Sequence, residues 1–350
     1  MRRALLAAAV ALLTSAPAAS ALPPIHHVWV VVLENKGFDA AFGPSSPATY
    51  LSKTLPAQGR LLPQYYGIGH ESLDNYVALV SGQAPNVETQ SDCQVYTDVV
   101  PGVVGPDGQA IGQGCVYPSA VPTIGDQLAA KGLPWRAYLQ DMGTACRHPD
   151  ANSHDTTQSA SATPGGEYAA RHNPFVYFHS ITDTPSCAAN DVDLSHLDAD
   201  LAAGSSAPAF SLVVPDLCED GHDTPCADGR PGGLISADAF LQTWVPKIVG
   251  SPAYADNGLV IVTFDEADTG DASACCAEPM GFNTINPGAT TYGPGGGRVG
   301  AVLLSPFVTP GSTDTTPYNH YSLLRTVEDL FGVGHLGYAG ADGLQPFTLG

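Results

Sequence analysis

Short apolar runs alternate with amphipathic stretches along most of this chain. Four runs have the length and composition of buried strands: His27–Leu33, Phe210–Val214, Leu259–Phe264 and Val299–Leu304. Apolar strands separated by helices predict a largely parallel sheet that is covered on both faces. We therefore expect an α/β fold, a three-layer α/β/α sandwich with a mostly parallel central sheet.

Helix start and stop signals flank four of the amphipathic stretches. They predict helices over Ser72–Ser81, Thr123–Ala130, Ser236–Val249 and His320–Leu330. Two further segments, 144–166 and 269–297, are rich in Gly, Ser, Thr, Asn and Pro. We interpret them as surface loops near a site, because functional residues concentrate on loops.

The composition excludes some partners. The 350 residues hold 34 acidic and 13 basic side chains, a formal charge of −21. A nucleic-acid footprint needs clustered Lys and Arg, so we expect no nucleic-acid partner. Docking on anionic lipid through a basic patch is disfavoured for the same reason. A phosphorylated substrate stays open, since a metal ion can invert the local field.

The N-terminus resembles a targeting segment. Arg2 and Arg3 precede the apolar run Ala4–Leu13, and Ala19–Ala21 has the small-x-small form of a cleavage site. We predict a signal peptide at 1–21, a single catalytic domain at 22–350 and a secreted protein. The alternative is a buried N-terminal helix. The apolar run is far shorter than the ~20 residues of a membrane span, and we expect no span elsewhere.

Export makes the cysteines informative. Eight cysteines in an oxidising compartment favour disulfides over zinc thiolates. Sequence does not fix their connectivity, and we take nearest-neighbour pairing as the working hypothesis. The eight are Cys93, Cys115, Cys146, Cys187, Cys218, Cys226, Cys275 and Cys276.

Acidic residues follow three of the predicted strands. Glu34-Asn35, Asp216 and Asp265-Glu266 stand at these ends. Ligands of open α/β sheets bind outside the carboxyl ends of the strands, so we expect these groups to share one cleft. Such carboxylates would repel one another unless a cation neutralised them, and oxygen ligands suit a hard divalent ion. The plain alternative is that acids at strand ends are solvated.

Ser72 opens the first predicted helix, where two roles compete. It suits a helix N-cap, and a hydroxyl at a helix N-terminus also suits phosphate binding. His320 similarly begins the last predicted helix and has a structural alternative. No role is assigned to four other histidines: His26, His27, His154 and His172.

Six ordered motifs give the chain a family resemblance. They are Glu34–Asp39 (ENKGFD), His70–Tyr76 (HESLDNY) with Ser81-Gly82, Tyr168–Phe178 (YAARHNPFVYF), Pro215–Asp223 (PDLCEDGHD), Thr263–Asp268 (TFDEAD) and Tyr318–Leu324 (YNHYSLL). Together they resemble the bacterial phosphoesterase family of acid phosphatases and phospholipases C, within the alkaline phosphatase superfamily. The chain is most similar to the small secreted acid phosphatases of that family. It departs from the family's common residues at Glu71, Asp74, Asp216 and Gly221.

The resemblance implies an alkaline phosphatase-like fold and roles for individual residues. One divalent metal ion, whether Ca, Mg or Zn, is expected among Glu34, Asn35, Ser72, Asp265 and Glu266. Ser72 is the expected nucleophile and Asn75 the expected phosphate-binding amide. His70, His222, Asp223 and His320 are expected to line the phosphate pocket, and either His222 or His320 would protonate the leaving group.

These features predict a secreted, metal-dependent phosphoric-ester hydrolase of the phosphomonoesterase type. Its substrate would be a phosphorylated small molecule or a phospholipid head group. A phospholipase C-type phosphodiesterase is the nearest alternative, and an inactive secreted binding protein on the same scaffold is the alternative from another class. A serine esterase is disfavoured, since the chain has no GxSxG elbow.

Overall fold

The computed structural model describes residues 22–277, 279–284, 287–288 and 293–350. The predicted signal peptide lies outside these residues, as do parts of the predicted 269–297 loop. The strands are β1 His27–Leu33, β2 Arg60–Leu62, β3 Tyr65–Tyr66, β4 Val100–Val104, β5 Ala110–Gln113, β6 Trp135–Leu139, β7 Asp191–Asp193, β8 Phe210–Val214, β9 Gly258–Phe264, β10 Ala301–Leu304, β11 Ser312–Thr313 and β12 Tyr318–Asn319. The α-helices are α1 Phe38–Phe42, α2 Leu55–Gln58, α3 Ser72–Ser81, α4 Ile124–Ala130, α5 His179–Thr182, α6 Ser186–Asn190, α7 Leu197–Leu201, α8 Gly233–Val249, α9 Pro252–Ala255 and α10 His320–Phe331.

Within the described part of the chain, the main sheet has eight strands in the order β11-β2-β10-β9-β1-β8-β6-β7. The run from β9 to β7 is parallel throughout, whereas β10 is antiparallel to β9 and to β2. The predicted α/β fold with a mostly parallel sheet is therefore confirmed. The short β10 reverses direction after the long segment that follows β9.

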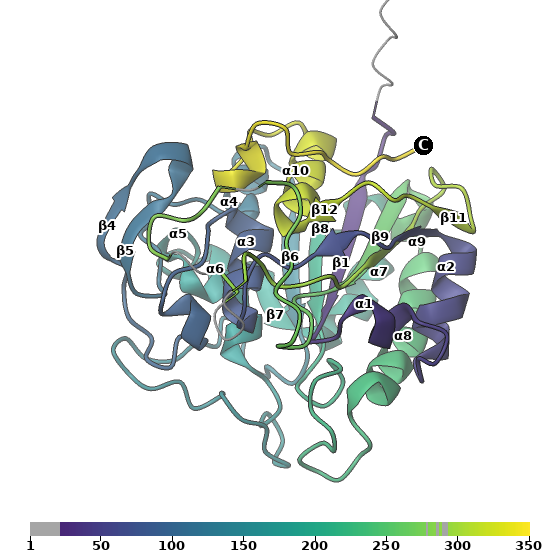
Figure 1. The fold of residues 1–350 in the computed structure, drawn as a ribbon, viewed down its shortest axis with the longest axis horizontal. Coiled ribbons are helices and arrows are strands. Elements are labelled where there is room, and N and C mark those ends of the chain that lie inside the picture. The colour runs from purple at the N-terminus through teal and green to yellow at the C-terminus, as the bar shows by residue number, and fades with distance from the viewer. Residues whose placement is uncertain (1–21, 278, 285–286, 289–292) are drawn as a thin grey trace, which may run out of the picture.

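Every residue of β1, β8, β9 and β10 is buried. This is expected for a sheet that helices cover on both faces. Trp29 of β1 packs on Tyr254 of α9, with ring centroids 6.4 Å apart. Trp135 of β6 packs on α4 so closely that a Cβ on Gly125 would lie 2.7 Å from its ring. Trp135 is in register with Phe210 and hence with Val28, whose side chain alternates with that of Trp29. The α4 group (α3, α4 and α10) and the α9 group (α8 and α9) thus lie on opposite faces (Figure 1).

Local signals explain where the predicted helices begin and end. Thr123 and Asp126 form the expected capping box on α4. Gly82 and Gly332 end α3 and α10 in the left-handed conformation.

The prediction for α8 was wrong at its start. The helix begins at Gly233, and the Ser236 hydroxyl accepts a hydrogen bond from the Gly232 amide at 3.1 Å from within the first turn. Gly232 has φ 66°, and a Cβ there would lie 2.0 Å from the Asp223 carbonyl oxygen. A glycine therefore sets the start of this helix. The predicted start was too late because Ser236 is a residue type that suits an N-cap.

The hypothesis of nearest-neighbour disulfides is confirmed. The bridges are Cys93–Cys115, Cys146–Cys187, Cys218–Cys226 and Cys275–Cys276, and all eight cysteines lie in the described residues. None of the helices in the described part of the chain is long and apolar enough to cross a membrane.

Candidate active site

Two side chains meet where β1 ends and α3 begins. Glu34 follows β1 and has no exposed surface, and Ser72 is the first residue of α3. The Ser72 hydroxyl donates to Glu34 Oε2 at 2.9 Å. The N-cap of α3 is Glu71, so Ser72 does not fill the capping role that competed for it. Its hydroxyl is directed into the acidic cluster.

Asn35 connects the ends of β1 and β9. Its backbone N–H donates to Asp265 Oδ1 at 3.0 Å, and its Nδ2 donates to Glu266 Oε1 at 3.0 Å. The residue has φ 48°, in the left-handed region that asparagine tolerates better than most side chains. This conformation lets one residue hold both acids that follow β9.

These groups leave buried oxygens without a hydrogen-bond donor. Asn35 Oδ1 and Asp265 Oδ2 have none, Glu34 Oε1 faces His172 Nε2 at 3.4 Å, and Glu266 Oε2 faces His70 Nδ1. Unsatisfied buried acceptors are costly, and carboxylate and amide oxygens are ligands of hard divalent cations. The predicted ligand set therefore fits a metal ion by its chemistry.

Burial makes the negative charges of this cluster unfavourable. It raises the pKa of Asp265 to about 7 and that of Glu34 well above the usual range. The charges of Asp265 and Asp220 raise the pKa of Glu34 further. A cation in the cluster would reverse these shifts, because it favours the ionised carboxylates.

His320 lies beneath the acids with both ring nitrogens hydrogen-bonded. Nε2 donates to the Asp265 carbonyl oxygen, and Nδ1 accepts from the Tyr65 hydroxyl at 2.8 Å. Burial lowers the pKa of His320 to about 4. A neutral ring held on both sides positions the Asp265 backbone. His70 is also buried, and its Nε2 donates to the Asp271 carbonyl oxygen at 3.1 Å.

His222 lies on the loop that follows β8. Its backbone N–H donates to Asp220 Oδ1 at 2.8 Å, and its side chain is exposed, within electrostatic range of Lys36 and Asp268. Asp223 follows it, half-buried, and its carbonyl oxygen accepts from Gly233 N at 2.7 Å. Of the two candidate leaving-group histidines, His222 is the one whose ring solvent reaches.

Asn75 has partners other than the expected phosphate. Its Oδ1 accepts from the amides of Ile68 and Gly69, and both Nδ2 hydrogens are used on the carbonyl oxygens of Gly69 and Glu71. In this structure the amide holds the loop that precedes Ser72.

Sequence reasoning missed two buried residues of the site. His172 lies between Glu34 Oε1, 3.4 Å from Nε2, and Asp220 Oδ2, 3.8 Å from Nδ1, and it stacks on Tyr76 with ring centroids 5.3 Å apart. Burial lowers its pKa well below the usual value and raises that of Asp220. Both residues stand inside the quoted motifs, Tyr168–Phe178 and Pro215–Asp223, and that was the available signal.

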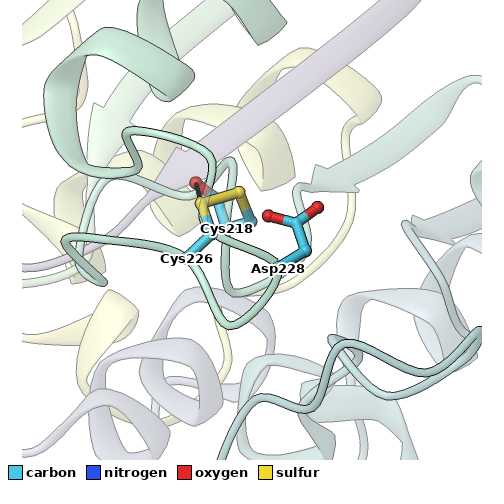
Figure 2. Close-up of side chains that lie close together, drawn as sticks. All are labelled: Cys218, Cys226 and Asp228. Atoms are coloured by element: carbon cyan, nitrogen blue, oxygen red, sulfur yellow. Dashed lines mark hydrogen bonds between the residues drawn. A yellow bond between two sulfur atoms is a disulfide. The ribbon is translucent and has the colours of Figure 1, made fainter.

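A second cluster can be set aside as a metal site. Among the described residues, the tight group of His, Cys, Asp and Glu ligand atoms consists of Cys218, Cys226 and Asp228. Figure 2 shows the two sulfurs bonded to each other, so neither can act as a thiolate ligand.

The model of the Phosphoesterase family matches residues 46–334. The chain belongs to this family. The predicted resemblance is thus confirmed.

Curated relatives include acid phosphatases. The chain is 25% identical to a "Probable acid phosphatase" of Kluyveromyces lactis over 88% of its own length and 59% of the relative. It is 23% identical to an acid phosphatase of Aspergillus fumigatus, over 81% of its own length and 51% of the relative. It thus spans about half to three fifths of these fungal proteins. It is also 25% identical to a phosphatidylinositol-3-phosphatase of Mycobacterium tuberculosis, over 92% of this chain and 82% of that one.

Solved structures agree on the fold. A protein of the alkaline phosphatase superfamily from Vibrio parahaemolyticus aligns with a TM-score of 0.50 at 14% identity, covering 93% of this chain and 71% of that one. A sulfatase from Pseudoalteromonas sp. aligns with a TM-score of 0.51 at 14% identity, covering 93% and 74%. The expected alkaline phosphatase-like architecture is confirmed.

Proposed function

We propose that this chain is a secreted, metal-dependent phosphomonoesterase that uses Ser72 as its nucleophile. The observation that carries the proposal is the Ser72 hydroxyl bonded to buried Glu34, beside an acidic cluster with unsatisfied oxygens. Carboxylates beside the Ser72 hydroxyl would repel an anionic substrate unless a cation is present. With a cation it becomes a nucleophile next to a place for a phosphoryl group.

Glu34, Asn35, Ser72, Asp265 and Glu266 would hold the ion. When bound, it supplies positive charge that offsets these acids and lowers the pKa of the Ser72 hydroxyl. His320 and Asn75 act behind this set: the ring supports the Asp265 backbone, and the amide fixes the loop before Ser72.

The reaction follows from the chain's own groups. Ser72 Oγ forms a bond to phosphorus while its proton passes to Glu34 Oε2, and the bond from phosphorus to the substrate's alcohol oxygen breaks. His222 gives that oxygen a proton. Water then attacks the phosphoserine and gives a proton to His222, the bond from phosphorus to Ser72 Oγ breaks, and Oγ regains its proton from Glu34 Oε2 as phosphate leaves. We assign the acid to His222 because its ring is exposed, whereas both nitrogens of His320 are occupied.

The substrate is a phosphate monoester of a small molecule or of a phospholipid head group. The acid phosphatases and the phosphatidylinositol-3-phosphatase among the relatives support monoesters over diesters. Export of a catalytic domain at 22–350 is supported by the four disulfides, which persist in oxidising compartments.

The test compares two hydrolysis assays on the purified chain and measures its bound metal. Hydrolysis of para-nitrophenyl phosphate is measured beside hydrolysis of a phosphocholine diester, each before and after chelation and metal repletion. We expect metal-dependent turnover of the monoester. Preference for the diester would support the phospholipase C-type alternative, and metal binding with neither turnover would support the inactive binding protein.

A further inference from the structure

The loop that carries His222 is anchored to the site at its inner side. The Glu34 amide donates to the Asp220 carbonyl oxygen at 2.9 Å, and Asp220 Oδ2 lies beside His172. Any shift of residues 216–223 therefore moves Asp220 and His222 relative to Glu34. The contacts that hold the outer side of the loop therefore bear on the geometry of the site.

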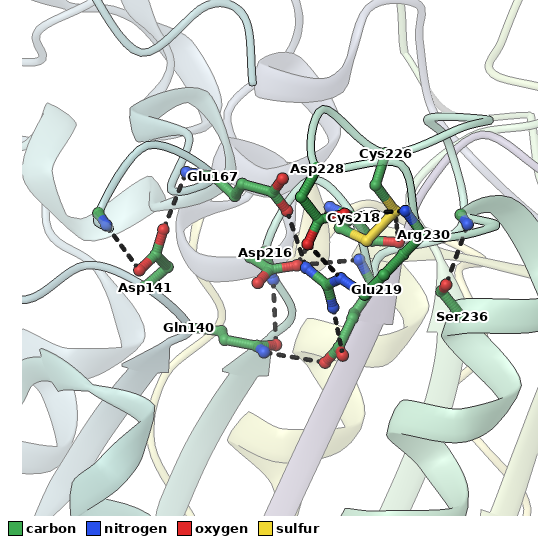
Figure 3. Close-up of polar contacts among 12 residues, drawn as sticks. Gln140, Asp141, Glu167, Asp216, Cys218, Glu219, Cys226, Asp228, Arg230 and Ser236 are labelled. Carbon is green, nitrogen blue, oxygen red and sulfur yellow. Dashed lines mark hydrogen bonds and ion pairs between the residues drawn. A yellow bond between two sulfur atoms is a disulfide. The ribbon is translucent and has the colours of Figure 1, made fainter. Parts of the chain in front are cut away.

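Arg230 holds the outer side through three carboxylates. Its Nη1 donates to Glu219 Oε1 at 3.0 Å, its Nε to Asp228 Oδ2 at 2.6 Å and its Nη2 to Glu167 Oε2 at 3.4 Å (Figure 3). Its carbonyl oxygen accepts from Cys226 N at 3.0 Å, next to the Cys218–Cys226 bridge. The Arg230 guanidinium thus links Glu219 and Asp228, on its own side of the junction, to Glu167 on a different segment.

The segment that holds Glu167 also carries His172, which lies between Glu34 and Asp220. Glu167 stands five residues before His172, and its carbonyl oxygen accepts from Leu217 N at 2.8 Å. Arg230 therefore connects the strand-end loop of Asp220 and His222 with the segment of His172. Because the Glu167 side chain is only 7% exposed, this arm is the least screened by solvent.

The rest of the network leaves the loop little freedom. Asp216 Oδ1 accepts from the amides of Cys218 and Glu219, and Gln140 Nε2 donates to Glu219 Oε2 at 2.8 Å. Four acids, Glu167, Asp216, Glu219 and Asp228, surround the one guanidinium in Figure 3. Removing that charge would leave like charges facing one another across the junction.

We propose that Arg230 is a positioning residue for the phosphatase reaction: it holds the 216–223 loop against the His172 segment and so sets Asp220 and His222 relative to Glu34 and Ser72. Each of its three nitrogens donates to a carboxylate, so the role assigned to it is structural and not substrate contact. The inference rests on the proposed function for its kinetic consequence only. Small displacements of positioned groups reduce turnover by up to about 100-fold.

The test uses Arg230→Met and Arg230→Lys, with Lys247→Met as the matched control. Lys247 pairs with Asp198 on the surface at 2.9 Å and is 42% exposed, close to the 43% of Arg230. We expect Arg230→Met to lower kcat about 10- to 100-fold with a small change in KM and no change in bound metal. Arg230→Lys should recover part of kcat, and Lys247→Met should match the wild type.

A double variant measures the energetic coupling between Arg230 and Glu167. If Arg230 acts through Glu167, Glu167→Gln and Arg230→Met should lower kcat by less together than the product of their separate effects. An unchanged kcat in folded Arg230→Met, or a fall matched by Lys247→Met, would overturn the inference.

A readout independent of catalysis separates this inference from the proposed function. Amide hydrogen exchange at residues 217–223 should be faster in Arg230→Met than in Lys247→Met, even if no phosphatase activity is found. A wild-type chain without activity would reject the proposed function alone. Equal exchange in the two variants would reject the positioning role.

Discussion

The hydroxyl of Ser72 donates to Glu34 Oε2 at 2.9 Å, which joins the first residue of α3 to the carboxylate at the end of β1. This bond distinguishes two roles of a serine at a helix start. A capping hydroxyl accepts from a backbone amide two or three residues on. At α3 the Ser72 hydroxyl instead donates to the Glu34 side chain, and the N-cap is Glu71. The Leu73 amide, two residues on from that cap, donates to Asp92 Oδ1 at 3.0 Å.

Replacing Ser72 tests the nucleophile. Ser72→Ala should keep its fold and metal and lose turnover by a factor on the order of 10³ or more. Ser72→Thr should keep part of the activity. Ser81→Ala is the control, because Ser81 lies buried on the same helix and donates to the Val77 carbonyl oxygen. Acid quench during turnover should trap phosphate on a peptide containing Ser72, and a near-normal rate in Ser72→Ala would contradict the assignment.

Replacing the buried acids tests the metal. Glu34→Gln and Asp265→Asn should lose bound metal and turnover together, since each removes a charged ligand. Glu328→Gln is the control: Glu328 is equally buried, but it lies on α10 and accepts from the Leu336 amide. Elemental analysis and activity before and after chelation provide the measurements. An enzyme that is fully active while free of metal would refute this prediction.

The two histidines should respond differently to the leaving group. His222→Ala should reduce hydrolysis of alkyl phosphates by about 10²- to 10⁴-fold and affect a nitrophenyl ester much less, because a good leaving group needs no proton. His320→Ala removes a buried ring that supports Asp265, so both substrates should lose activity alike and the melting temperature should fall. Equal losses on both substrates in His222→Ala would argue against its role as the acid.

Glu328 should give stability a pH dependence unrelated to catalysis. Burial raises the pKa of Glu328 to about 9 from a usual 4.5, so the folded state binds a proton that the unfolded state has lost between these values. This contribution to stability is complete below about pH 4.5 and is lost as the pH rises through about 9. Glu328→Gln stays neutral, so relative to the wild type it should gain stability steadily from pH 5 to pH 9, by up to about 1.4 kcal/mol per pH unit. Thermal unfolding of both proteins across that range would reveal it, and parallel curves would contradict it.

The parts of the fold that sequence predicted are those with a local cause. β1 and β9 are continuous apolar runs, and the Thr123–Asp126 capping box needs only adjacent residues. The acids after these strands were found because parallel strand ends meet at one edge. β6, which reads WRAYL, gave no continuous run, and the antiparallel direction of β10 depends on the long excursion before it.

The parts of the site that sequence missed depend on tertiary contacts. His172 is indistinguishable from other histidines until folding brings it between Glu34 and Asp220. The Asn75 amide was assigned to phosphate by family resemblance, yet the backbone of 68–71 satisfies its hydrogen bonds. Arg230 has an ordinary surface composition around it in the sequence, and its three acids come together only through the loop geometry.

The four disulfides divide the chain into separate closed segments. The bridged cysteines are 22, 41, 8 and 1 residues apart in chain order, and no bridge crosses or encloses another. A chain that enters an oxidising compartment N-terminus first can thus close each bridge as soon as its second cysteine arrives. If the chain is exported as proposed, oxidation in order of arrival yields these four pairs without disulfide shuffling.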